Sequence, residues 1–444
     1  MLVGPVLGAH LGPVLDRMRT ALQADAAGDA AEPVDIEAAM EPLLRELAGV
    51  VVSFLAGQVD GGRVANRHVC SCGGHYQFVR KQLRWIGALF GEVRPLRALY
   101  RCRACGKGRV PLDQVLGLQS GAYRMGRSYL APRAQEMLGR LVAALPYEEA
   151  RRHFQALTGL KVSGMLGWRL AQRLGRQLQQ QQAQVGEPAA RETGQRPRWL
   201  VSADGVMVAF WRGGRQRRAR KAGSKKQRNG IRWQEVKVGL VAQLDKTGAV
   251  VRGSQSYLIC RVSAEAFRRQ MSRMAKWRGV LCTDVVAVVT DGAKWLRALA
   301  TRHFPEATAV RDFFHAAQHL TVMAVALYGE GSRAATKWQK TAAKRLKAGA
   351  MAAMLAEWSQ LKREPKDARV WERERKYFAS QQAQMAYDQF REARLPIGSG
   401  AIEGACKSTV ASRFRRPGAR WSEEGFRNLA ALRARYCTGG PLMP

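Results

Sequence analysis

Acidic residues are scarce in this chain of 444 residues, which has 35 Asp and Glu against 73 Lys and Arg and a formal net charge of +38. A balance this basic favours a polyanionic partner, and nucleic acid is the commonest polyanion in a cytoplasm. Binding to an anionic membrane surface is the alternative, but the sequence has no lipidation motif and no basic amphipathic anchor. Residues 1–60 hold nine acids and three bases, so we expect the nucleic-acid surface in the rest of the chain.

Long apolar runs and a disulfide framework are also missing. No uncharged apolar run approaches the roughly 18 to 20 residues that span a bilayer. The apolar segment 1–20 lacks a leading positive region and a cleavage site, so we interpret it as an amphipathic helix and expect a cytoplasmic, nucleoid-associated protein. Eight cysteines in a chain of this length exclude a disulfide scaffold. The length allows two to four domains.

Four of the cysteines form two close pairs, spaced C-x-C, 29 residues, C-x2-C: Cys70, Cys72, Cys102 and Cys105. Thiolates from two tight turns can complete a tetrahedron around zinc, and strand-like runs at 76–89 and 92–101 between them predict a zinc ribbon with a structural Zn2+. The first pair is one residue tighter than the common knuckle, so His68 or His75 could replace one thiolate. The alternative is a cluster of reduced cysteines without metal.

The periodicity predicts helices first and a mixed sheet later. Residues 128–184 should be helical, with a break at Thr158–Gly159 and Ser163 as an N-cap; this is a helix-turn-helix pattern, or a helical hairpin that only packs. From residue 198 three strands come in succession, and then helices and strands alternate before a long helical stretch, 314–394. That order matches an RNase H-like fold. The expected strands are 198–211, 233–245, 250–262, 284–292 and 307–312, and the expected helices between them are 264–278 and 293–302.

We therefore expect a multidomain α+β protein. Its parts are an N-terminal helical segment, a zinc-ribbon domain, a helical or helix-turn-helix DNA-binding region, and an RNase H-like α/β catalytic core interrupted by an all-helical insertion. The core's final helix and a basic tail complete the chain. In chain order these parts cover 1–66, 67–125, 126–186, 187–313, 314–395 and 396–444.

Two aspartates lie where charge is costly. Asp204 is in the middle of the first core strand, and Asp291 ends the fourth. A lone Asp at a strand end usually caps a turn or helix. Two carboxylates on neighbouring strands can instead hold divalent cations, which activate an attacking oxygen and stabilise a leaving one. Oxygen ligands of this kind favour Mg2+.

Several motifs in fixed order resemble a known family: "ADG", "VVTDGAKWL", "DFFHAAQHL", "LPIGSGAIEGACK" and "RWSEEG", preceded by "VPLDQVLGL" after the cysteine ribbon. Over residues 67–435 the chain resembles bacterial insertion-sequence DDE transposases of the ISKra type, which share the Mutator-like layout. The C-x-C pair departs from the family pattern. The resemblance implies a triad of Asp204, Asp291 and Glu403 that holds two Mg2+ (or Mn2+) ions, with a site role for Asp312 and His315.

It also implies a reaction and partners. The expected activity is cleavage and strand transfer at the element's terminal inverted repeats and at target double-stranded DNA, by at least a homodimer and with no membrane partner. An RNase H-like nuclease or resolvase is the alternative, and a zinc-dependent DNA-binding regulator with an inactive catalytic domain is another.

Local chemistry leaves competing interpretations for the last acid and its neighbours. Ser399 can cap the helix that carries Glu403, and flanking glycines allow a tight corner. Glu403 could instead pair with Lys407 four residues on. A phosphate-binding loop is a weaker interpretation, because the stretch lacks the preceding strand and the Lys-Ser/Thr ending of a P-loop. Asp312 and His315 could simply begin a helix; no glutamate follows His315, so a zinc-protease motif is excluded.

Basic residues cluster in "RGGRQRRARKAGSKKQR", where nine Lys or Arg fall within 212–228, and again around "RFRRPGARW". Such segments suit a phosphate backbone, and a tryptophan among arginines suits base stacking at partly unpaired DNA ends, or core packing. The expected DNA-binding residues are Arg217, Arg218, Lys221, Lys225, Lys226, Lys294, Lys407, Arg413, Arg415, Arg416 and Trp421.

Overall fold

The computed structural model describes most of the chain, in two compact units that are taken separately: Met1–Leu174 with Pro441–Pro444, and Gly175–Gly440. No helix in the described part combines the length and apolar character needed to cross a membrane. The described residues are 12–13, 15–20, 22–23, 36–58, 63, 69–115, 123–125, 128–183, 196–211, 230–361 and 363–443.

The first unit combines short strands with helices. One sheet has the order β1-β4-β5 and a second the order β3-β2-β7-β6. The elements in chain order are α2 (Ile36–Gln58), β1 (Tyr76–Leu83), β2 (Ile86–Ala88), β3 (Gly91–Val93), β4 (Leu96–Cys102), β5 (Gly108–Arg109), α3 (Pro111–Val115), β6 (Tyr123–Met125), β7 (Ser128–Leu130), α4 (Pro132–Ala144), α5 (Tyr147–Thr158) and α6 (Gly164–Ala183), the last of which continues into the second unit.

Two expectations for this unit need correction. Each arm of the predicted hairpin is broken, so β1 pairs with β4 while β2 and β3 join the other sheet. The break falls at Pro95, which has no N–H for the ladder and instead accepts a hydrogen bond from Arg84 N. Residues 128–130, predicted to be helical, form strand β7, because they pair with β2 and β6.

The turn between α5 and α6 follows the sequence. Gly159 ends α5 with φ of 70°, a left-handed conformation that glycine adopts without strain. Ser163 Oγ accepts a hydrogen bond from Leu166 N, as expected of an N-cap.

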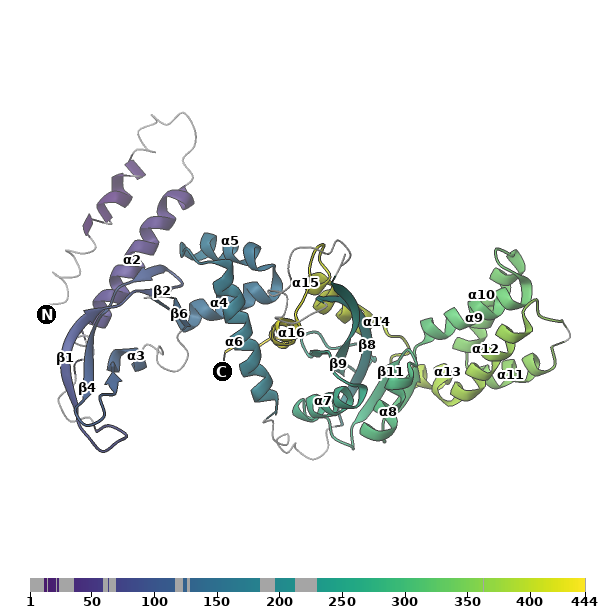
Figure 1. Ribbon diagram of the computed structural model, residues 1–444. Helices are drawn as coiled ribbons and strands as arrows, with labels where there is room; N and C mark the ends of the chain where they lie inside the picture. Colours follow the sequence, from purple (N-terminus) through teal and green to yellow (C-terminus); the bar gives the residue numbers. More distant parts are fainter. Residues whose placement is uncertain are drawn as a thin grey trace, which may run out of the picture. The chain divides into compact units, whose positions relative to one another are not determined.

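The second unit is built on a five-stranded sheet of order β10-β9-β8-β11-β12. Strands β8, β9 and β10 are antiparallel, whereas β11 runs parallel to both β8 and β12 (Figure 1). The core elements are β8 (Arg198–Trp211), β9 (Ile231–Leu244), β10 (Ser256–Cys260), α7 (Ala264–Trp277), β11 (Val285–Thr290), α8 (Lys294–His303) and β12 (Thr308–Arg311).

The remaining elements of this unit are helical. They are α9 (Phe313–Tyr328), α10 (Arg333–Lys347), α11 (Met351–Ser359), α12 (Ala368–Gln381), η3 (Gln382–Met385), α13 (Tyr387–Glu392), α14 (Gly400–Ala405), the π-helix η4 (Cys406–Ala411), α15 (Ser412–Phe414) and α16 (Glu423–Thr438). The predicted strands and helices of 198–312, and the helical stretch after them, are confirmed to within two residues at every end but one. The strand predicted at 250–262 spans only Ser256–Cys260, because the chain before it turns, with Ser254 N donating to Val251 O at 3.1 Å.

Alternation along β8 gives the sheet two distinct faces. Trp199, Val201 and Ala203 pack with α7 and α8 residues such as Phe267 and Leu299 in a buried core. The even-numbered residues point the other way. There Phe210 meets Phe426 of α16 in an edge-to-face contact with ring centroids 5.2 Å apart. Asp204 is therefore on the face opposite α7 and α8.

Helices α9–α13 leave the sheet and return to it at one place. Phe313 N donates to Ile397 O at 2.8 Å, and Ser399 N donates to the Asp312 carboxylate at 3.0 Å. The core of these helices is aromatic, with Trp338, Trp358 and Trp371 in mutual contact. The chain can hold this long helical segment because its two ends are joined by hydrogen bonds beside the sheet.

Candidate functional site

Two parallel strand pairings bring three aspartates level with one another. Val289 of β11 pairs with Ser202 of β8, so continuing the register by two residues places Asp291 level with Asp204. On the other side Asp312 N donates to Thr290 O at 2.9 Å, which places Asp312 beside Asp291. Carboxylates at matching positions of neighbouring parallel strands lie at one end of the sheet.

Asp204 is partly buried, and its surroundings disfavour its charge. Burial is the largest cause that raises its pKa above the ordinary value of 3.8, and the nearby charges of Asp291 and Glu403 raise it further. Hydrogen bonds from Gly205 N at 2.6 Å and from the Cys406 thiol at 3.7 Å act in the opposite direction. The Cys406 contact brings the end of α14, the helix that carries Glu403, against Asp204.

Glu403 is tied to the sheet through a serine. Ser399 Oγ donates to Glu403 Oε1 at 2.8 Å and also lies 3.0 Å from Asp312 Oδ2. The prediction that Ser399 caps α14 is therefore half right: it occupies the N-cap position, but its hydroxyl makes no capping hydrogen bond. Asp312 does cap α9, accepting from Phe314 N and His315 N.

We call Asp204, Asp291, Asp312 and Glu403 the acid cluster. Among the ion pairs of the described residues none involves any of these four carboxylates, and in particular Glu403 forms none with Lys407. Their oxygens do not all lie within 4.8 Å of one another; in the described part of the chain only the four ribbon cysteines meet that criterion. The acid cluster is thus a set of neighbouring carboxylates that no ion pair within the described residues neutralises, although the buried Arg311 guanidinium lies against the turn that follows Asp291.

A histidine relay borders the acid cluster. His315 Nε2 lies 3.3 Å from His319 Nε2, and His319 Nδ1 lies 2.5 Å from the buried carboxylate of Glu374 on α12. Tyr377 stacks on His319 with ring centroids 3.9 Å apart, and burial raises the pKa of Tyr377 to about 12. Asp291 and Asp312 also raise that pKa. Helices α9 and α12 therefore place these side chains beside the acid cluster.

A buried arginine lies under the turn that follows Asp291. Arg311 is 1% exposed, and its guanidinium donates to Gln381 and Gln384. Gly292 has φ of +95°, and a Cβ there would lie 1.5 Å from Arg311 Nη1. Only glycine fits this position, both for its backbone and for its space.

The sequence analysis missed Cys406, Glu374, Tyr377 and Arg311. Cys406 begins a π-helix, a rare form that is frequent at functional sites, and its thiol meets Asp204. Its spacing of three residues from Glu403 on a helix was the one available signal. Glu374 and Tyr377 come from the inserted helices, far along the chain, and no local pattern distinguishes them from other helical residues.

The four ribbon cysteines form a group that could hold a metal ion. Cys70 and Cys105 sulfurs are 3.6 Å apart, as are those of Cys72 and Cys102. A tetrahedral zinc with Zn–S bonds of about 2.3 Å has sulfur–sulfur edges of about 3.8 Å, so the described geometry fits such an ion. His75, an alternative ligand, is outside this group.

Hydrogen bonds also prepare two of these thiols for metal. The Tyr76 hydroxyl, at 3.5 Å, is the main cause that lowers the pKa of Cys70 to about 6, and the Cys105 N–H is the main cause that lowers the pKa of Cys102. For Cys105 the Lys107 N–H lowers the pKa, but contacts with Cys72 and Cys70 outweigh it and raise the value to about 12. Thiolates are the form that binds metal.

The predicted DNA-binding residues divide into several groups. Lys407, Arg415 and Arg416 are exposed, whereas Arg413 is 3% exposed with its guanidinium over the Trp421 ring, so this geometry does not present it to DNA. Trp421 is half-buried against Phe414 and donates its indole N–H to Phe414 O, which favours core packing. Lys294 begins α8, but its side chain is not among those that the structure describes. Arg217, Arg218, Lys221, Lys225 and Lys226 lie outside the described residues.

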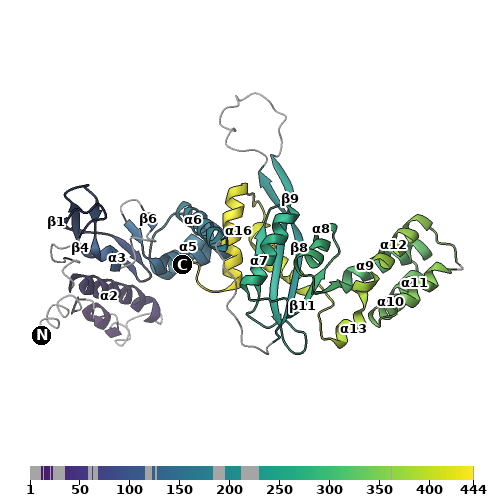
Figure 2. The ribbon, with the colours of Figure 1, turned by 90° about the horizontal axis from the view of Figure 1, so that it is seen from below.

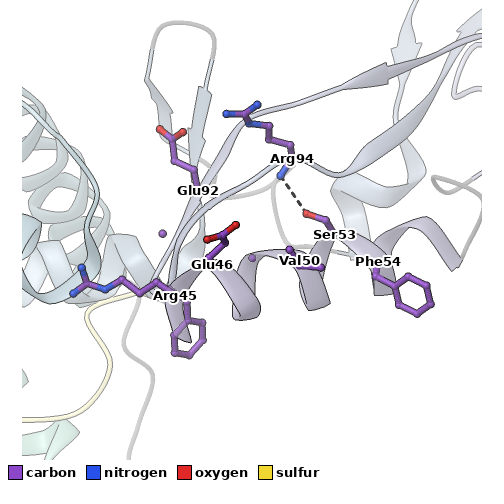
Figure 3. A pocket seen from close by; sticks show the side chains of 10 residues that line it. Arg45, Glu46, Val50, Ser53, Phe54, Glu92 and Arg94 are labelled. Carbon is purple, nitrogen blue, oxygen red and sulfur yellow. Dashed lines mark hydrogen bonds between the residues drawn. The ribbon is translucent and has the colours of Figure 1, made fainter. Parts of the chain in front are cut away.

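A cavity of about 660 Å³ is found in the first unit, and none of the predicted site residues lines it (Figure 3). Helix α2 and the β2–β3 turn line it, and Ser53 Oγ accepts a hydrogen bond from Arg94 N at 3.4 Å. Side chains of both charges line this cavity, among them Arg45, Glu46 and Glu92. Its mixed charge indicates no ligand class, and it carries no weight for function.

Comparisons with known proteins leave the family open. No family model matches the chain, and no curated protein matches it. Among solved structures it is similar to a Drosophila P element transposase strand transfer complex, with 13% sequence identity and a TM-score of 0.27, over 73% of this chain and 81% of that one. A likeness of this extent carries no argument, so any functional conclusion must come from the site itself.

Proposed function

We propose that this chain is a DNA transposase that binds the terminal inverted repeats of its own mobile element. Metal-dependent cleavage and strand transfer would use Asp204, Asp291 and Glu403. The observation that carries the proposal is the acid cluster: Asp204 of β8, Asp291 just after β11 and Glu403 of α14 lie in one neighbourhood, and none of them forms an ion pair among the described residues. The two aspartates are partly buried, and Glu403 is exposed. Such a set is unfavourable unless cations bind it.

Two further features support this choice of function. The strand order β10-β9-β8-β11-β12, antiparallel and then parallel, is the one expected of an RNase H-like core. The motifs that carry Asp204, Asp291 and Glu403 occur in the order of the insertion-sequence transposases that the sequence resembles. We propose that helices α9–α13 are the all-helical insertion of such an enzyme.

Carboxylate oxygens suit Mg2+ or Mn2+. Bound at Asp204, Asp291 and Glu403, such ions would supply the positive charge that activates an attacking oxygen and stabilises the leaving one. The chain's own groups hold those ligands in place. Ala293 N donates to Asp291 Oδ1 at 2.9 Å, and Ser399, itself held by Asp312, orients Glu403. These contacts fix one oxygen of Asp291 and of Glu403 and leave the other for metal.

The proposed chemistry is two displacements at phosphorus. In cleavage a P–O bond forms to water and the P–O3′ bond breaks, which releases a 3′-hydroxyl. In strand transfer that hydroxyl attacks a target phosphate in the same way. His315 borders the acid cluster and can accept or hold a proton there, with His319 and Glu374 fixing its ring.

We also propose that the four ribbon cysteines hold a structural zinc, and that this unit, with α5 and α6, binds the repeats. At least two chains would act together, because two element ends must be brought to one target. The same site in a nuclease would cut without joining, and in a regulator it would not cut.

A cleavage and joining assay with element-end DNA and a supercoiled target plasmid tests the proposal. Wild-type protein should nick and join in Mg2+, whereas Asp204→Asn, Asp291→Asn and Glu403→Gln should each lose at least a thousandfold of both activities and still bind the DNA. Glu424→Gln, which alters an exposed acid paired with Arg176, is the matched control. Cleavage that survives in Asp291→Asn contradicts the assignment, and cleavage without joining indicates the nuclease.

A further inference from the structure

The outer end of the β8–β9 ribbon carries large apolar side chains that the fold leaves exposed. Met207, Trp211 and Trp233 are 46%, 41% and 58% exposed. In Figure 2 the two strands extend side by side beyond the helices that cover the middle of the sheet. A soluble protein rarely exposes two tryptophans so close together unless they bind something.

Strand register places these side chains on one face. Trp233 pairs with Ala209, and Trp211 is two residues further along β8, so both indoles point to the same side and are diagonal neighbours. Met207 follows the same alternation. Diagonal neighbours on a sheet are within reach of aromatic side chains, about 7–8 Å apart.

The C-terminal segment adds arginines to this face. Trp421 forms a bridge beside Phe210, accepting from Trp211 N at 3.0 Å and donating to Ala209 O at 3.1 Å. Trp421 therefore shares the inner face with Phe210, and Arg420 points to the opposite one. The Arg420 guanidinium lies 5.2 Å from the Trp211 ring centroid.

Arg415 completes the arrangement, with its guanidinium 6.0 Å from the Trp233 ring centroid. We call Met207, Trp211, Trp233, Arg415 and Arg420 the indole face. Exposed indoles with arginines over them suit a ligand that has both flat rings and negative charge. Nucleobases on a phosphate backbone have both, and base stacking on aromatic rings is tolerant of sequence.

We propose that the indole face binds unpaired bases of the DNA strand that is processed at the acid cluster. This inference rests on the proposed function, because that function says which DNA is bound. The base-stacking role considered for Trp421 is thereby assigned to Trp211 and Trp233. Trp211 is seven residues along β8 from Asp204, about 23 Å of extended strand, and its side chain points to the opposite face of the sheet. The unpaired strand would therefore pass around the β8–β9 ribbon between the acid cluster and the indole face.

Fluorescence anisotropy of labelled oligonucleotides in EDTA, where no cleavage occurs, tests the proposal with full-length protein. The probes are a blunt duplex and the same duplex with a single-stranded tail of about ten nucleotides. Trp211→Ala and Trp233→Ala should each weaken binding of the tailed probe by about fivefold to a hundredfold and leave the blunt probe within twofold. Trp→Tyr at either position should keep most of the affinity, because a ring remains.

The chain offers a matched control. Trp277, the last residue of α7, is 43% exposed and has the Arg278 guanidinium 5.9 Å from its ring, yet it lies outside the indole face. Trp277→Ala should change neither probe. Arg415→Ala should weaken the binding of both probes. The slope of log affinity against log salt should fall by about one, because one fewer counterion is released.

Two binding results would overturn the inference: a preference for the tailed probe that survives in the double Trp→Ala variant, or an equal loss of affinity for both probes in that variant. A changed sedimentation coefficient with unchanged DNA binding would also overturn it, because a second copy of the chain would then cover this face. If the double Trp→Ala variant does not fold, quenching of wild-type tryptophan fluorescence by the tailed probe but not by the blunt one decides the matter. Because Asp291→Asn should keep the tail preference, failure of this inference and failure of the catalytic assignment are distinguishable.

Discussion

Replacing Gly292 by alanine should destabilise the second unit more than any ordinary surface change. The residue has φ of +95°, and holding a non-glycine residue there costs about 1–3 kcal/mol. The added Cβ would also lie 1.5 Å from Arg311 Nη1, so the buried guanidinium must move away from Gln381 and Gln384. Weakening hydrogen bonds of a buried charged group costs about 1.5–3 kcal/mol. The sum is a loss of about 2.5–6 kcal/mol.

Two other glycines separate these effects. Gly253 has φ of +81° and nothing within 4 Å of its would-be Cβ, so Gly253→Ala should cost only the backbone strain, about 1–3 kcal/mol. Gly404 lies in α14 with open space around it, and Gly404→Ala should be neutral or stabilise by up to about 1 kcal/mol. Urea unfolding followed by tryptophan fluorescence gives the three values. The reasoning is refuted if Gly292→Ala and Gly253→Ala destabilise equally.

Three more predictions follow from individual contacts. Cys102→Ser, or a strong chelator, should release one zinc per chain and melt the β1–β4 pairing, measured by metal analysis and amide hydrogen exchange; unchanged exchange would contradict a structural metal. The pKa of Asp204 is higher in the folded chain than in the unfolded chain. As the pH rises above about 4 the unfolded chain therefore loses this proton first, and the free energy of unfolding falls. At neutral pH the charged Asp204 carboxylate lowers the stability of the fold. Asp204→Asn should therefore raise the urea midpoint at pH 7 in metal-free buffer, and a lower midpoint there would contradict this. Glu374→Gln should slow cleavage about tenfold and shift its pH profile. Glu372→Gln, which alters an acid of the same helix paired with Arg375, should change neither the rate nor the profile, and identical profiles for both variants would exclude the His319 relay.

Much of the second unit's fold could be predicted from the sequence because its signals are local. The strand of Asp204 and the apolar run before Asp291 are visible as alternation and as a continuous apolar segment. The positions of Asp204 and Asp291 on those strands then follow. Glu403 could be assigned only through the motif order, because α14 is short and follows a long helical segment.

What could not be predicted depends on distant contacts. By local rules the Ser399 hydroxyl should cap helix α14, yet it donates instead to the carboxylate of Asp312, 87 residues earlier. Glu374 lies among other charged residues on α12 and is distinguished only by where that helix packs. For Trp421 the sequence leaves base stacking and core packing both open. Its bridge to β8 and its contact with Phe414 favour core packing, whereas Trp211 and Trp233 are exposed.

Counting bound Mn2+ by electron paramagnetic resonance tests the central claim most directly. With element-end DNA bound, the wild-type chain should hold about two ions at the acid cluster. Asp204→Asn, Asp291→Asn and Glu403→Gln should each lose at least one of them, and Glu424→Gln should lose none. Unchanged Mn2+ binding in all three variants would contradict a shared metal site and, with it, the proposed catalysis.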